Sequence, residues 1–153
     1  MKPREIAALR QRGSDGVAPA SGGSFVAPTR QVASVTTPSL APDAVWNGTI
    51  TLAKAYRLYA VQADGDCRLI IYTDTGSRTA DASRALGVLP APGAGVVMEF
   101  WFGPGPMSAT LSPVVDGFSA AIPATSSIPI TVTNLSTSSA ALTINLVYLV
   151  VEE

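Results

Sequence analysis

The chain has 153 residues, of which 47% are hydrophobic and 14% are charged, and its formal net charge is −1. That length suits one domain with a tail. The near-neutral charge argues against broad binding to phosphate backbones, so nucleic acid is not expected as a partner. Charged residues fall well below the roughly 25% of a typical soluble domain. This favours a surface partly covered by self-association or docking over one kept soluble by Ser and Thr.

The residue types exclude several kinds of site. The chain contains no histidine, which removes His-based catalytic dyads and triads and the commonest metal ligand. Cys67 is the only cysteine, so neither an intramolecular disulfide nor a cysteine metal cluster can form, and a buried, inert thiol is expected. We predict no enzymatic activity, no catalytic residues, no cofactor and no metal.

Residues 1–30 are predicted to form a basic anchor helix and a flexible arm, followed by a separate domain at residues 31–153. Residues 13–30 are rich in Gly, Ser, Ala and Pro, as flexible linkers are. A disordered tail is the alternative. No run here resembles a secretory signal, and none in the chain is long enough to cross a bilayer, so no membrane insertion is expected. The residues predicted to dock on a partner are Lys2, Arg4, Ile6, Leu9, Arg10 and Arg12.

The segment Trp46–Thr73 has the clearest strand patterns. Period-two alternation puts Ala44, Trp46, Gly48, Ile50 and Leu52 on one face of an extended segment. Two further strands are predicted at Tyr56–Val61 and Arg68–Thr73. The sequence Asp64-Gly65-Asp66 between them predicts a hairpin turn. A calcium site there is disfavoured, because that ion needs six to eight oxygen ligands.

Residues 75–87 are predicted to be a short helix over one end of the domain. Arg78, Asp81 and Arg84 follow one another at a spacing of three, which would place them on one helix face. Asp81 could then form structural ion pairs with both arginines. An exposed pair of this kind contributes well under about 1 kcal/mol, so its expected role is orientation.

Val96–Phe102 is the most hydrophobic predicted strand. Val96, Met98, Phe100 and Phe102 share one face, and Val97, Glu99 and Trp101 share the other. Two largely apolar faces indicate burial on both sides or a subunit contact. We predict a homo-oligomer, specifically a trimer, with Val97, Glu99 and Trp101 at the subunit interface. A general-acid Glu99 with a raised pKa is the less favoured alternative, and Trp101 is kept as a candidate for stacking on sugars.

Further strands are predicted at Gln31–Thr37 and Met107–Val115, with a turn at Asp116-Gly117. A last hairpin is predicted to join Ile128–Leu135 to Ala141–Val151 across residues 136–140. Seven or eight strands separated by turn residues predict an all-β, antiparallel, jelly-roll-like sandwich with one short helix and an extended N-terminal arm.

Residues 31–151 resemble a small β-sandwich module of tailed-bacteriophage virion proteins. The segments that carry the resemblance are Leu52–Leu58, Cys67–Thr73, Arg78–Arg84, Leu111–Pro113 and Ile130–Leu135. The resemblance implies a structural or receptor-facing part of a virion, assembled in the host cytoplasm and commonly oligomeric. It brings no catalytic residues.

This resemblance does not cover residues 1–30, which would dock on other virion proteins. A tail-fibre or baseplate-associated protein is the preferred interpretation, with the sandwich projecting from the particle. The alternatives are a capsid decoration (cement) protein and a carbohydrate- or receptor-binding module, for which a host surface glycan would be the partner.

Overall fold

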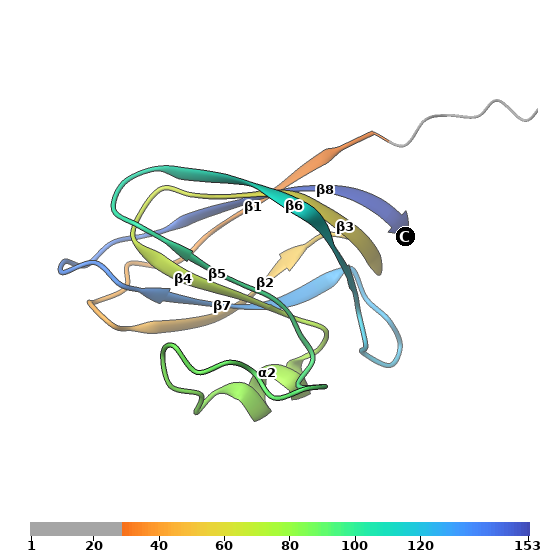
Figure 1. Ribbon diagram of the computed structural model, residues 1–153, viewed down its shortest axis with the longest axis horizontal. Helices are drawn as coiled ribbons and strands as arrows, with labels where there is room; N and C mark the ends of the chain where they lie inside the picture. Colours follow the sequence, from red (N-terminus) through yellow and green to blue (C-terminus); the bar gives the residue numbers. More distant parts are fainter. Residues whose placement is uncertain (1–28) are drawn as a thin grey trace, which may run out of the picture.

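The structure is a computed structural model that describes residues 29–153. The predicted docking residues Lys2, Arg4, Ile6, Leu9, Arg10 and Arg12 lie outside the described residues. Two four-stranded antiparallel sheets pack face to face (Figure 1), which confirms the predicted all-β sandwich. One sheet has the order β1 (Gln31–Thr36), β8 (Thr143–Glu152), β3 (Ala55–Ala63) and β6 (Met107–Phe118). The other has the order β2 (Val45–Thr51), β7 (Ser127–Asn134), β4 (Cys67–Tyr72) and β5 (Val96–Phe102).

Consecutive strands mostly lie in opposite sheets, in the arrangement of an eight-stranded jelly roll. Both predicted hairpins are therefore wrong. Asp64-Gly65-Asp66 joins β3 to β4 across the sandwich, and residues 136–140 join β7 to β8 in the same way. A turn signal marks where the chain reverses, but it does not specify the hydrogen-bonding partner. A strand with one apolar face buries that face equally well in the same sheet as the preceding strand or in the facing sheet.

The hydrophobic core lies between the two sheets. β2 alternates as predicted, with Ile50 buried and Trp46 packed against the core from the same face. The Trp46 ring also covers Gly48, where a Cβ atom would lie 2.0 Å from the ring. The side chains that line the middle of the core are Ile50, Leu58, Val61, Leu69, Ile71, Ile130, Val132, Ile144 and Leu146, none more than 1% exposed.

β6 continues through the turn predicted at Asp116-Gly117, so that prediction is wrong. Asp116 lies opposite Arg57 of β3, and Gly117 lies opposite Tyr56. The Tyr56 ring is fully buried and covers Gly117, where a Cβ atom would come within 2.5 Å of the ring. The glycine is needed for the close approach of an aromatic ring to the backbone.

We expect Gly117→Ala to lower the free energy of unfolding by about 1–3 kcal/mol, because the buried Tyr56 ring has no room to move away from the added methyl group. Chemical denaturation measures the change. Gly103→Ala is the matched control, since its nearest neighbour, Met107 Sδ, lies at an ordinary 3.4 Å. Equal effects of the two substitutions would contradict the packing explanation.

Candidate functional site

The outer face of the β2-β7-β4-β5 sheet is covered by the chain that connects β4 to β5. This connection contains the helix α2 (Thr75–Asp81), which packs against β7 and β4 (Figure 1). Asp74 caps the helix, with its Oδ1 accepting a hydrogen bond from the Ser77 amide at 2.8 Å. The helix is shorter than predicted and ends at Asp81. Residues 82–95, which follow it, are called the cover loop below.

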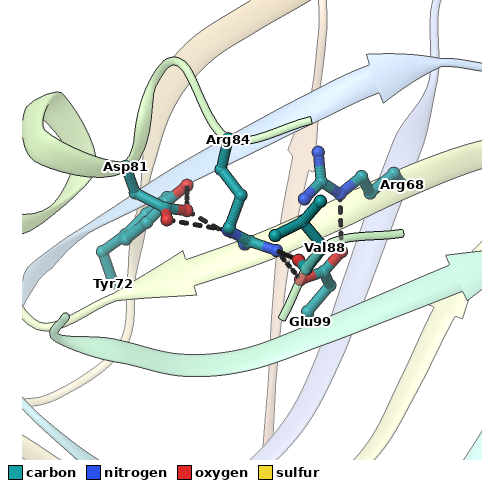
Figure 2. Close-up of polar contacts among 6 residues, drawn as sticks. All are labelled: Arg68, Tyr72, Asp81, Arg84, Val88 and Glu99. Atoms are coloured by element: carbon teal, nitrogen blue, oxygen red, sulfur yellow. Dashed lines mark hydrogen bonds and ion pairs between the residues drawn. The ribbon is translucent and has the colours of Figure 1, made fainter. Parts of the chain in front are cut away.

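Four charged side chains form a buried ion cluster beneath the cover loop. Its members are Arg68, Asp81, Arg84 and Glu99, with side chains between 6% and 17% exposed. Glu99 accepts hydrogen bonds from Arg68 Nε at 2.6 Å and from Arg84 Nη1 at 2.7 Å (Figure 2). Arg84 also donates to both carboxylate oxygens of Asp81, at 2.7 and 2.9 Å. The cluster thus connects β4, β5 and the cover loop.

Arg84 and Tyr72 extend the cluster to the backbone and to the sheet. Arg84 Nη1 donates to the carbonyl oxygen of Val88 at 2.6 Å within the cover loop, and the same nitrogen donates to Glu99 of β5. The Tyr72 hydroxyl donates to Asp81 Oδ2 at 3.0 Å (Figure 2). The helix end and the cover loop are therefore attached to the outer face of β4 and β5 through side chains.

The predicted ion pair between Asp81 and Arg78 is wrong. Arg78 Nη1 instead donates to the carbonyl oxygens of Gly48 at 2.7 Å and Ile130 at 3.4 Å, which attaches the helix to β2 and β7. The prediction assumed one helix from Arg78 to Arg84, whereas Arg84 lies beyond the helix end. The pair between Asp81 and Arg84 is also buried rather than exposed, because the cover loop lies over it.

Both carboxylates of the cluster stay ionised at neutral pH. Hydrogen bonds from Arg84 lower the pKa of Asp81. Burial acts to raise the pKa of Glu99, but the hydrogen bonds from Arg68 and Arg84 outweigh it, and the net shift is downward. The alternative of a general-acid Glu99 with a raised pKa is therefore wrong. Two carboxylates and two guanidinium groups sum to zero charge. Burial raises the pKa of Tyr72 to about 12, so its hydroxyl remains a neutral donor.

The predicted interface residues do not share one outer face. Val97 lies at a bulge in β5, where Ile71 and Tyr72 pair with Met98 and Val96, and it packs against the core. Glu99 belongs to the buried ion cluster. Trp101 is 43% exposed, and the guanidinium carbon of Arg68 lies 5.5 Å from its ring centroid. β5 is an edge strand with β4 as its partner, and its outer face is not fully buried within the chain, because Trp101 is exposed. Of the two alternatives, burial on both sides is therefore wrong, and a subunit contact stays a prediction.

Two residues of this site were not predicted as site residues: Arg68 of the buried ion cluster, and Tyr72, which donates to Asp81. Arg68 carried a signal, because it is the one charge in the apolar strand Cys67–Tyr72 and a buried charge needs a partner. Glu99 and Asp116 are the only ionic residues between Ala85 and Val151. The sequence thus indicated that Arg68 needs an acidic partner, but it did not select Glu99 over the other acids of the chain. Nothing in the sequence marked Tyr72 as a donor to Asp81.

A groove of about 310 Å³ lies between the cover loop and the outer face of the sheet. The sheet contributes Asn47, Arg68, Ile70 and Thr133 to its wall, and the cover loop contributes Ala82, Ala85 and Leu86. Arg68 is only 6% exposed, and its Nη2 has no hydrogen-bond partner among residues 29–153. A buried donor without a partner costs about 1–3 kcal/mol. The Tyr56 hydroxyl is also buried without a partner among these residues, but of the two residues only Arg68 lines the groove.

Other sequence candidates lie away from the groove. Asp64 Oδ1 accepts a hydrogen bond from the Thr143 amide at 2.8 Å. Residues 29–153 contain no group of three or more Cys, Asp or Glu side chains placed to hold a metal ion. Burial raises the pKa of the Cys67 thiol to about 12, with smaller contributions from Asp64 and Asp66, so the thiol stays protonated at neutral pH. Within the same residues, no helix has the length and apolar character needed to cross a membrane.

Comparison of the chain with protein-family models, with curated proteins and with solved structures found no match. Function is therefore inferred from the covered face of the β2-β7-β4-β5 sheet. At neutral pH the cluster carboxylates are each bound to arginine, and such an arrangement positions a loop rather than transferring protons.

We expect Glu99→Gln to lower the free energy of unfolding by about 3 kcal/mol, measured by urea denaturation at pH 7. The substitution keeps the shape of the side chain but leaves two buried arginines without their shared carboxylate. Asp116→Asn is the control, because it breaks an ion pair with Arg57 whose side chains are 43% and 64% exposed. This control is expected to change stability little. Similar small effects of both substitutions would show that the buried ion cluster does not hold the fold.

Proposed function

We propose that this chain is a non-enzymatic structural protein of a bacteriophage virion. In this proposal the N-terminal arm, residues 1–30, docks on the tail fibre or baseplate region and the sandwich projects from the particle. The resemblance of residues 31–151 to virion sandwich modules supports the assignment. An apolar surface on the covered face of the sandwich supports a role in assembly.

The observation that carries the proposal is the exposure of apolar side chains around the buried ion cluster. Leu86, Val88 and Leu89 on the cover loop are 52%, 53% and 87% exposed, and Trp101 on β5 is 43% exposed. We call these four residues the apolar loop surface. Arg84 binds both the Val88 carbonyl within the loop and Glu99 on β5, which attaches the loop to the sheet. A fixed apolar surface with its neighbouring charges already paired is suited to contact with another protein subunit.

We propose that the apolar loop surface joins copies of this chain into a homo-oligomer, specifically a trimer. The expected result is a trimer at micromolar concentration, measured by multi-angle light scattering. Leu89→Glu should shift the mass to that of a monomer, because burying a carboxylate at a contact is unfavourable. Ile122→Glu is the matched control, since Ile122 is fully exposed but lies outside the apolar loop surface, on the β6–β7 connection. A monomeric parent protein would contradict the trimer, and an unaffected Leu89→Glu would contradict this contact.

Particle assembly tests the proposal as a whole. Purified particles from the host that carries the gene should contain this chain, detected by mass spectrometry. Deletion of residues 1–24 is expected to abolish incorporation. It should leave the sandwich folded, because the described core cluster begins at Ala33. Circular dichroism and thermal melting of the truncated chain provide the folding control.

Immunogold electron microscopy of the same particles locates this chain on the particle. Label at the tail is the expected result, whereas label over the head would favour capsid decoration instead. Absence of the chain from particles would overturn the virion assignment, and normal incorporation of the truncated chain would overturn the docking role of the arm.

A further inference from the structure

Arg68 is one of two described residues with a buried side-chain polar atom that has no hydrogen-bond partner; the other is Tyr56, which does not line the groove. It donates from Nε to Glu99 at 2.6 Å, while Nη2 is closed off from solvent and has no partner among residues 29–153. Figure 2 shows one of the two Nη atoms of Arg68 pointing away from Glu99. Arg84, by contrast, uses its three nitrogen atoms on Asp81, Glu99 and Val88. An acceptor is therefore missing on one side of Arg68.

The groove beside Arg68 has the mixed character of a small-ligand site. Its volume of about 310 Å³ falls at the lower end of the range for ligand pockets. Ile70 and Leu86 give it apolar walls, while Asn47 and Asp43 bring an amide and a carboxylate to the same space. The hydroxyl of Thr131 donates to Asn47 Oδ1, so the amide nitrogen is the end of Asn47 left for other contacts within the described chain.

The charges around the groove favour a neutral ligand over an anion. The two arginines and two carboxylates of the buried ion cluster cancel, and Asp43 adds a further negative charge at the wall. An acidic ligand would approach a carboxylate that no arginine neutralises. A hydroxyl group both accepts and donates hydrogen bonds, so one polyol can accept from Arg68 and donate to Asp43.

We propose that this groove binds a neutral, hydroxyl-rich small molecule of monosaccharide or disaccharide size. A ligand hydroxyl oxygen accepts a hydrogen bond from the Nη side of Arg68, and the C–H face of the ring lies against Ile70 and Leu86. Ala82, Ala85 and Leu86 form an exposed outer wall. In this proposal the cover loop shifts when the ligand binds, so that the ligand oxygen reaches Nη2. This binding role goes beyond the proposed structural role and does not depend on it.

Isothermal titration calorimetry on the full chain tests the proposal. The probes are neutral mono- and disaccharides, namely glucose, galactose, mannose, N-acetylglucosamine, maltose and lactose, with glucuronate as a charged comparison. We expect at least one neutral sugar to bind with a Kd of about 1 mM or tighter. Glucuronate is expected to bind more weakly than the neutral sugar, because Asp43 repels it.

Two variants place the binding in the groove. Arg68→Lys keeps a positive charge beside Glu99 but removes the Nη donors, and it should weaken binding by about tenfold or more, as loss of a hydrogen bond to a charged group does. Ala85→Tyr fills the groove from the exposed cover loop and should abolish binding without touching the core. Ser83→Tyr is the matched control, because Ser83 is exposed on the same loop but does not line the groove; it should bind as the parent chain does.

Three results would overturn the proposal. They are no binding of any neutral sugar, unchanged affinity in Ala85→Tyr, and tighter binding of glucuronate than of the neutral sugars. Thermal melting of each variant shows whether it is folded. If Arg68→Lys unfolds, the comparison of Ala85→Tyr with Ser83→Tyr still decides the outcome.

Discussion

The carboxylate of Glu99, held between two arginines, is the interaction on which the covered face depends. Each oxygen accepts one hydrogen bond, from Arg68 on β4 and from Arg84 on the cover loop. Removing three or more charges from water is costly, and the cost is offset only where the partners are close and their charges cancel. The bonds of 2.6 and 2.7 Å meet that condition. Loss of Glu99 would leave Arg68 without its carboxylate partner and Arg84 paired with Asp81 alone.

That dependence follows from the topology. β4 and β5 are the one pair of strands, within the part of the chain described, that are neighbours both in sequence and in a sheet. Their connection is too long to be a tight turn, and it folds back over the outer face instead. The strand β4 is consequently buried at all six positions, with the core on one side and the cover loop on the other. The opposite sheet carries its ion pair, Arg57 with Asp116, in the open.

The two proposals use different parts of this covered face. The apolar loop surface points away from the sheet and is exposed for contact with another subunit. Arg84 holds the loop, and the charge of Arg84 is paired with the carboxylates of Asp81 and Glu99. The groove lies beneath the same loop, where Arg68 has donors left over. One buried carboxylate thus positions both an outer surface suited to subunit contact and an inner space suited to a small ligand.

The sequence by itself determined the fold class, most strand positions and the inward-facing residues, because period-two alternation is a local property that burial enforces. It also determined that Asp81 and Arg84 are near each other, since three residues separate them. Strand partners were decided only by the tertiary structure. A strand can bury the same apolar face whether it pairs with the preceding strand or lies in the facing sheet. The same holds for Arg78, which reaches backbone carbonyls of β2 and β7. Likewise, the pairing of Glu99 with Arg68 and Arg84 joins residues far apart in the chain. Glu99 was predicted at a subunit interface, and it lies at the centre of a buried ion cluster because the cover loop folds onto the sheet.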